Sequence, residues 1–340
     1  MATAKSPHEI PRRAIWGLDA VNFFLADVRD ALGPYLAVYL LTVQKWDAAS
    51  IGVVMSIATA AGIAMQTPAG ALIDVTRAKR AMVAAAAVFV AVVSFALPFL
   101  PTFWPVALSQ ATAHAATAAF GPAIAAITLG IVGRAGFAAR TGRNESFNHL
   151  GNALAASAAG AGAWLWGPGV VFWVLAVMAL ASLVSVLMIP ERAIDHARAR
   201  ELHEVAGDGG EGPRGLAILL TCRPLLIFAV CAVLFHFANA AMLPLVGQKL
   251  SLQDNRLGTT LMSVCIIAAQ VVMVPMAMLV GAKADAWGRK PLFLAGFLIL
   301  PVRGFLYTLS DDPFGWSASS CLTASVPASM ARCFRLSLPT

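Results

Sequence analysis

The chain has 340 residues, of which 59% are hydrophobic and only 12% charged, and its mean hydropathy is +0.77. A soluble globular domain carries roughly 25% charged residues, so the composition excludes an ordinary soluble protein and predicts an integral membrane protein. The net charge of +7 does not indicate a nucleic-acid partner, because Lys and Arg also gather beside membrane helices.

Nine apolar windows approach the length of about 20 residues that a helix needs to cross the bilayer. A lone span satisfies all of its backbone groups only as a helix, so we expect an all-α integral membrane protein. The expected spans are 17–43, 49–73, 81–99, 103–131, 145–166, 170–189, 224–246, 257–280 and 291–309.

Lys and Arg cluster on one side of these spans. With the N-terminus in the cytoplasm, seventeen of them fall in cytoplasmic segments and three, Lys45, Lys249 and Arg256, in external loops. Short cytoplasmic loops carry an excess of Lys and Arg. We therefore predict a multi-pass protein of the cell inner (plasma) membrane with a cytoplasmic N-terminus.

The first span carries charges where hydrocarbon disfavours them. Asp27 and Asp30 share one helical face, Arg29 points elsewhere, and Asn22 widens the polar sector. Such residues usually face the interior of a bundle and mark a pathway, so we expect them to handle substrate or protons; the alternative is a structural ion-pair network. Gly33-Pro34 should kink or unwind the helix. Arg29 should need a partner on another helix or in a wet cavity.

The fourth and fifth spans also carry polar side chains at helical spacing. His114 lies between Gln110 and Thr117, ahead of Gly121-Pro122. The fifth span begins with a polar stripe in which a His and a carboxylate one turn apart could change protonation near neutral pH. The alternatives are solvation at the interface and satisfaction by a neighbouring helix. The stripe comprises Glu145, Asn148, His149 and Asn152, after Asn144.

A polar, glycine-rich segment, 191–223, separates two groups of spans and is predicted to be a cytoplasmic linker. It divides an N-terminal six-helix bundle, 1–190, from a partial C-terminal bundle, 224–310. In the second group, His236 and Asn239 stand three residues apart, and Arg303 lies deep enough to need an acidic partner. We include all three among the candidate pathway residues.

Two short cytoplasmic turns repeat one pattern. The chain reads GALIDVTRAKR over 70–80 and GAKADAWGRKP over 281–291, and both have G-x-x-x-D followed by basic residues after two spans of a group. A small residue lets helices approach closely, and an aspartate at a helix end can accept hydrogen bonds from a neighbouring helix. The matched positions indicate an internal repeat.

These turns, with six spans and a central loop, resemble the major facilitator superfamily (MFS), whose signature G-x-L-x-D-R-x-G-R-[KR] is met in part twice. The resemblance implies an MFS-type bundle with a six-span N-terminal half and about three spans of the C-terminal half. It also implies a gating role for Gly70, Asp74 and Arg77, and for Gly281, Asp285, Arg289 and Lys290. Drug and proton antiporters of this superfamily often carry the pattern G-x8-G-x3-G-P in the fifth span. In this chain only its first interval is kept, between Gly151 and Gly160.

The last segment, 311–340, lacks apolar runs and is rich in Ser, Ala and Cys. In a reading frame that starts at the third base of each codon, a T at the start of an original codon becomes the middle base of the shifted codon. Codons with T in the middle encode only Phe, Leu, Ile, Met or Val. One permitted codon choice from Gly315 then gives an apolar span. We therefore expect a C-terminally truncated chain with a non-membrane tail produced by a frameshift; an ordinary tail is the alternative, and the coding DNA distinguishes them.

Together these features predict a secondary active transporter that moves a small solute by alternating access, with protons as a second partner and the lipid bilayer as its environment. The alternatives are a truncated, non-transporting remnant and a drug/proton efflux antiporter. The sequence holds no phosphate loop, nucleophile elbow or metal-ligand cluster, and its five cysteines show no paired spacing. We expect no enzyme, cofactor, metal or disulfide. Oligomeric state does not follow from the sequence.

Overall fold

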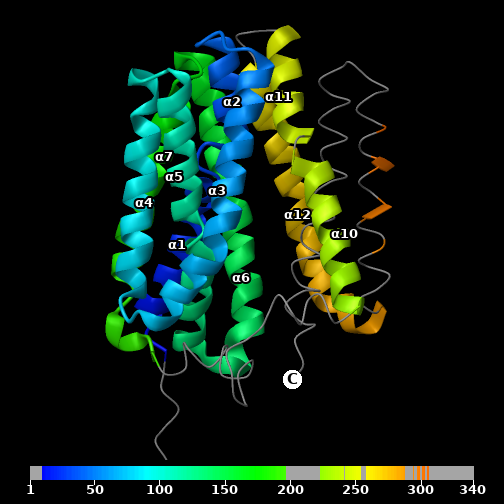
Figure 1. The fold of residues 1–340 in the computed structure, drawn as a ribbon. Helices are drawn as coiled ribbons and strands as arrows, with labels where there is room; N and C mark the ends of the chain where they lie inside the picture. Colours follow the sequence, from blue (N-terminus) through cyan, green and yellow to red (C-terminus); the bar gives the residue numbers. More distant parts are fainter. Residues whose placement is uncertain are drawn as a thin grey trace, which may run out of the picture. The chain divides into compact units, whose positions relative to one another are not determined.

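The computed structural model describes residues 10–196, 223–240, 242–253 and 258–287, with six single positions between 294 and 305. All regular elements in these ranges are helices (Figure 1). The expected all-α fold is therefore confirmed. The expected tail, 311–340, lies outside the described residues.

The first expected span forms two helices, α1 (Arg12–Arg29) and α2 (Gly33–Thr42). Ala31, Leu32 and Gly33 between them have φ angles of 45°, 76° and 44°, and the first two are left-handed conformations that side chains disfavour. Pro34 lies in the first turn of α2, where its missing N–H has no intrahelical partner to lose. The break expected at Gly33-Pro34 is confirmed, and it begins just before that pair.

The next helices follow the expected spans closely. They are α3 (Ala48–Val75), α4 (Lys79–Phe95) with the short 3-10 turn η1 (Leu97–Phe99), α5 (Phe103–Thr117), α6 (Phe120–Trp166), α7 (Val170–Met188) and the turn η2 (Glu191–Ala193). Inside α6, Gly133 has φ 69° and ψ 178° and breaks the helix between the fourth and fifth expected spans. Gly167, with φ 89°, ends it and donates its N–H to the carbonyl of Ala163.

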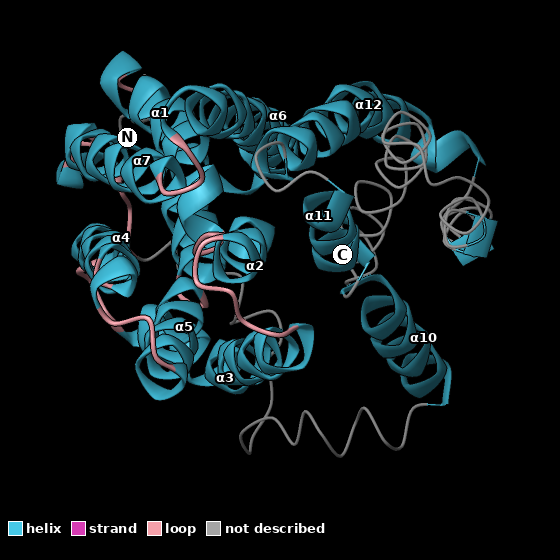
Figure 2. Cartoon of the chain, turned by 90° about the horizontal axis from the view of Figure 1, so that it is seen from above, coloured by secondary structure: helices cyan, strands magenta, loops and turns pink. Residues whose placement is uncertain are grey.

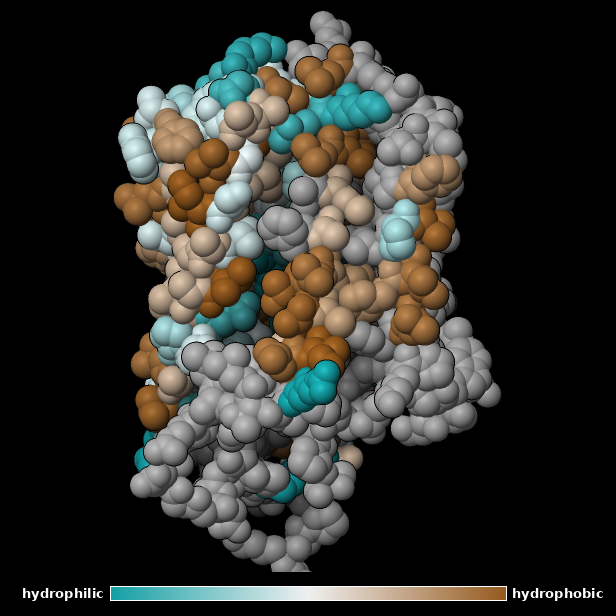
Figure 3. All heavy atoms as spheres, turned by 45° about the vertical axis from the view of Figure 1, so that its right-hand side comes forward, coloured by the Kyte–Doolittle hydropathy of each residue, from teal (hydrophilic) through white to brown (hydrophobic). Residues whose placement is uncertain are grey.

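Beyond the linker, the structure describes α10 (Arg223–Ala240), α11 (Met242–Gln253) and α12 (Gly258–Trp287). Four helical stretches in the described residues are long and apolar enough to cross a membrane, namely Ala48–Val75, Lys79–Phe99, Phe103–Phe137 and Val170–Met188. Large apolar side chains stand exposed on them, among them Trp104 and Val177. Figure 3 shows hydrophobic side chains over much of the described surface on one face. A lipid-facing surface has this character.

The described helices belong to two compact units. The first contains α1, most of α3, α4, α5, α6 up to Gly151 and most of α7. Within it α1, α4 and α5 pack against one another. The end-on view in Figure 2 shows α4 beside α5. Its core includes Leu18, Leu25, Val90 and Ile127, all fully buried.

The second unit contains α2, the end of α6 from Asn152, and α10 to α12. Here α2 packs against α11 and α12. Tyr35 and Ser263 share a hydrogen bond of 2.9 Å between their hydroxyl oxygens, and Thr260 donates its hydroxyl to the carbonyl of Gly160 at 2.9 Å. Glycine is needed at 160, because a Cβ there would lie 2.7 Å from the Cβ of Ser263.

Candidate functional site

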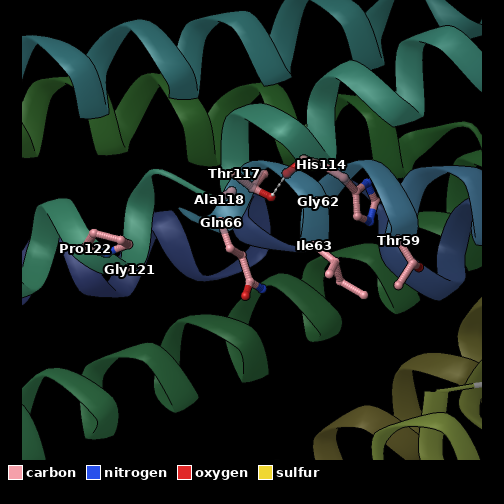
Figure 4. A pocket seen from close by; sticks show the side chains of 9 residues that line it. All are labelled: Thr59, Gly62, Ile63, Gln66, His114, Thr117, Ala118, Gly121 and Pro122. Carbon is pink, nitrogen blue, oxygen red and sulfur yellow. Dashed lines mark hydrogen bonds between the residues drawn. The ribbon is translucent and has the colours of Figure 1, made fainter. Parts of the chain in front are cut away.

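A cavity of about 580 Å³ lies in the first unit, within the range of roughly 300–1,000 Å³ typical of ligand pockets. It is open to the surface, and both polar and apolar residues line it. One face of α3 lines it through Thr59, Gly62, Ile63 and Gln66, which follow the i, i+3, i+4, i+7 spacing of a helical face. Figure 4 shows the side chains of Thr59, Ile63, Gln66 and His114 extending into one space. The described lining is completed by His114, Thr117, Ala118, Gly121 and Pro122, from α5 and α6.

Local hydrogen bonds orient the polar groups of this cavity. The hydroxyl of Thr59 donates to the carbonyl of Met55 at 2.8 Å, and that of Thr117 donates to the carbonyl of His114 at 2.9 Å. His114 Nδ1 lies 3.1 Å from the carbonyl oxygen of Gln110. Because a carbonyl oxygen only accepts, Nδ1 carries the hydrogen, and in the neutral ring Nε2 is left as an acceptor. At Gly62, α3 lies against α5, since a Cβ there would be in van der Waals contact with the Cβ of His114, at 3.5 Å.

The charged end of α1 forms a second group of candidate residues. Asn22 is buried and donates to the carbonyl of Leu18 at 2.8 Å, while its Oδ1 accepts from Nη2 of Arg29 at 3.4 Å. Arg29 thus has an acceptor on its own helix, where the sequence suggested another helix or water. Asp27 is half-buried, and Asp30 is exposed at the end of α1, where its N–H donates to the carbonyl of Asp27. This group immediately precedes the strained break.

The polar stripe of the fifth span lies on α6, close to α1. A Cβ on Gly151 would collide with the backbone carbonyl of Phe23 and would lie 3.0 Å from the Cβ of Ala26. Gly151 therefore lets the two backbones approach closely. Asn148 lies one turn before Gly151, and its Oδ1 is buried without a hydrogen-bond partner among the described residues. The remaining members, Glu145, His149 and Asn152, are each half-buried.

A buried ionic cluster joins α1 to the part of α6 that follows Gly133. Asp19 Oδ1 accepts from Nη2 of Arg140 at 2.7 Å and from Nε of Arg143 at 2.9 Å, and its Oδ2 accepts from Nη2 of Arg143 at 2.7 Å. Arg140 Nε also donates to Asn144, whose amide donates to the hydroxyl of Thr128. Asp19 and Arg140 are 7% and 6% exposed, so this charge pair is almost completely removed from solvent.

The electrostatics of the cluster differ between its two arginines. Burial lowers the pKa of Arg140, and the negative charge of Asp19 opposes that effect. Hydrogen bonding to Asp19 raises the pKa of Arg143, whose side chain is 54% exposed and lies over the ring of Phe147. Because arginine stays protonated in proteins, both guanidinium groups are charged and bind the carboxylate of Asp19.

In the first repeat turn, 70–80, the basic residues that bind neighbouring carbonyls are Lys79 and Arg80, to which the sequence analysis assigned no role. Lys79 is buried and donates its ammonium to the carbonyls of Ile73 and Thr76, at the end of α3. Arg80 donates to the carbonyls of Val186 and Leu187, at the end of α7. Arg77 is exposed and Asp74 half-buried. No described atom lies within 4 Å of a Cβ built on Gly70.

Several predicted residues fall where their side chains are not described. Gly281 and Asp285 belong to α12, and His236 and Asn239 to α10, with only their backbones described. Arg289, Lys290 and Arg303 lie outside the described residues. Their proposed roles stay predictions, as does the division into bundles at 1–190 and 224–310.

Sequence reasoning missed the cavity residues on α3 and the partners of Asp19. Thr59, Gly62 and Gln66 are small or polar residues on one face of an otherwise apolar span, and that spacing was a usable signal. Asp19 was a signal as well, because a carboxylate inside an apolar segment needs a cationic partner. His114 is the predicted pathway residue that lines the described cavity.

Comparison with known proteins places the chain in a family. The family model of the Major Facilitator Superfamily matches residues 18–338. Two relatives from Mycobacterium tuberculosis, strains CDC 1551 / Oshkosh and ATCC 25618 / H37Rv, are each named an uncharacterized MFS-type transporter. Each is 54% identical over 305 residues, covering 90% of this chain and 73% of the relative.

Solved structures of similar fold are transporters as well. The crystal structure of the nucleoside transporter NupG has a TM-score of 0.69 at 16% identity, covering 95% of this chain and 80% of that chain. The D-xylose-proton symporter has a TM-score of 0.62 at 14% identity, covering 96% of this chain and 81% of that chain. With the apolar helices and the family match, these similarities show that the chain belongs to the Major Facilitator Superfamily and is a multi-pass membrane transporter.

Proposed function

We propose that the protein is a secondary active transporter that moves a small polar solute across the cell inner membrane by alternating access, coupled to protons. The cavity of the first unit carries the proposal, because it is large enough for a small solute and polar side chains from membrane helices line it. Polar groups within a membrane bundle usually mark the path of the transported species.

Protons are proposed as the coupling ion because titratable groups lie on helices of the same unit as the cavity. Asp27 and Asp30 stand one turn apart at the end of α1, and Glu145 and His149 stand one turn apart on α6. Protonation removes the charge of a carboxylate, and a neutral group crosses between aqueous and buried surroundings at a much lower free-energy cost. A transport cycle can use this difference to link solute movement to a proton.

The test separates solute exchange from proton-driven accumulation in proteoliposomes. Exchange of labelled for unlabelled solute needs no net proton movement, whereas accumulation needs a pH gradient. Asp27→Asn and Asp30→Asn should each keep exchange and lower accumulation at least tenfold. The matched control is Asp47→Asn, because Asp47 is exposed and binds Ser50 at the start of α3. Unchanged pH dependence in both test variants would rule out coupling at the end of α1.

A further inference from the structure

The described lining of the cavity contains no carboxylate, lysine or arginine side chain. A charged solute bound against this lining would give up part of its hydration without gaining a compensating opposite charge. The aspartates and the arginine at the end of α1 do not belong to this lining. The cavity is therefore suited to a solute without net charge.

The polar atoms of the lining are mainly acceptors. The hydroxyl hydrogens of Thr59 and Thr117 are directed to backbone carbonyls, so the lone pairs of their oxygens remain available. His114 donates its Nδ1 hydrogen to the carbonyl of Gln110, so its Nε2 is available as an acceptor. Gln66 adds a carboxamide that both accepts and donates. A matching ligand supplies several hydrogen-bond donors.

Apolar surface lies among these acceptors. Ile63, Ala118 and Pro122 line the same cavity and offer contacts to C–H groups. From this arrangement we infer that the cavity binds a neutral, hydroxyl-rich solute of the polyol or sugar class, whose hydroxyls donate to Thr59, Thr117 and His114. This inference rests on the proposed function, because it names the class of solute that the transporter carries.

Gly121 offers a direct way to fill the cavity. It lines the cavity, and no described atom lies within 4 Å of a Cβ built on it, so a side chain at this position begins in open space. Gly121→Leu should therefore leave the fold intact and abolish solute binding. Gly142→Leu is the matched control, because Gly142 lies on α6 outside the lining and its Cβ position is equally open.

Two isosteric variants test the acceptors. Thr117→Val removes a lining hydroxyl, and losing one hydrogen bond to the solute should weaken binding roughly tenfold. Thr112→Val is its control on α5, since the hydroxyl of Thr112 also donates to a backbone carbonyl but Thr112 does not line the cavity. The thermal unfolding temperature of each purified variant in detergent, measured without solute, shows whether the variant is still folded.

The experiment uses the full chain in proteoliposomes and measures both binding and exchange for three classes of probe. They are neutral polyols and sugars of three to six carbons, the dication putrescine, and the dianion succinate. Binding and exchange of a neutral probe, lost in Gly121→Leu and weakened in Thr117→Val, support the inference.

The contrary outcomes are distinct for the two proposals. Exchange of putrescine or succinate, with no binding of any neutral probe, would overturn the inferred solute class and leave the transport function standing. Equal binding of a neutral probe by Gly121→Leu and the unchanged chain would overturn the assignment to this cavity. Binding of a neutral probe at the cavity without exchange would support the inferred class and contradict transport.

Discussion

At the scale of single residues, the buried Asp19 binds two arginines, of which Arg140 is buried and Arg143 is half-exposed. Removing one partner from a buried ion pair leaves an uncompensated charge, which costs about 3–5 kcal/mol. A half-exposed partner can rehydrate and costs much less when its counterpart is removed. The three members of the cluster therefore differ in how much the folded chain depends on them.

We expect Asp19→Ala to lower the free energy of unfolding by about 3–5 kcal/mol, because Arg140 stays buried without its carboxylate. Arg143→Ala should cost no more than about 1 kcal/mol, since the side chain is 54% exposed and Arg140 still binds Asp19. Denaturation of the purified protein by titration with a denaturing detergent measures both. Equal losses in the two variants would contradict the proposed order.

The sequence located the polar residues of the first span, but it did not reveal which residues they contact. The sequence placed Asn22, Asp27, Arg29 and Asp30 on one helical span; α1 contains the first three, and Asp30 is its C-cap residue. It could not reveal that Asn22 accepts from Arg29, because a contact across seven residues depends on the rotamers of both side chains. The partners of Asp19 were hidden for another reason, since they lie more than 120 residues away along the chain.

At the scale of elements, small residues control how closely helices approach. Gly160 of α6 lies against Ser263 of α12, and Gly151 lies against the backbone of α1. Alanine normally stabilises a helix relative to glycine by about 1 kcal/mol. Where a helix neighbour fills the Cβ position, the added methyl group instead forces the backbones apart, at a cost of about 1–3 kcal/mol.

The same substitution should consequently have opposite effects at two positions of α6. Gly160→Ala is expected to lower the free energy of unfolding by about 1–3 kcal/mol, because its methyl group would lie 2.7 Å from the Cβ of Ser263. Gly142→Ala should be neutral or raise it by up to about 1 kcal/mol, because its Cβ position is open. Thermal unfolding of the two purified variants tests this difference in sign. Stabilisation by Gly160→Ala would refute the close packing.

Helix boundaries were predictable where glycine and proline mark them. Gly33-Pro34 and Gly121-Pro122 each lie in the first turn of a helix, and Gly167 ends α6. The boundary at Gly133 was less visible, because the residues after it continue as one helix through the polar segment that the sequence assigns to a cytoplasmic connection. Helical propensity in that segment outweighed the polar composition that suggested a turn.

At the scale of the whole molecule, the distribution of Lys and Arg predicts the orientation in the membrane. Asp47 and Arg192 are both exposed, and the orientation places them on opposite sides. In a chain whose five cysteines are replaced, Asp47→Cys should react with an impermeant maleimide on intact cells. Arg192→Cys should react only after permeabilisation. The reverse pattern would show that the N-terminus is external.

The fold class followed from the sequence because hydropathy is a property of long segments. A window of about 20 apolar residues has only one stable form in hydrocarbon, so the helices were expected before their contacts were known. The cavity did not follow, because its lining combines α3 with α5 and α6, and no local pattern says which faces of these helices meet. His114 was found through its spacing from Thr117, whereas the spacing of Thr59, Gly62 and Gln66 along α3 was a signal that the sequence reasoning did not use.

The break in the first span has an energetic consequence for any movement of that span. Ala31 and Leu32 hold left-handed φ angles, each of which costs about 1–3 kcal/mol relative to the right-handed helix. A rearrangement that returns both residues to negative φ would release this free energy as it joins α1 to α2. The broken first span is thus a conformation of higher backbone energy, and straightening it beside Asp27 and Asp30 would contribute to driving a conformational change.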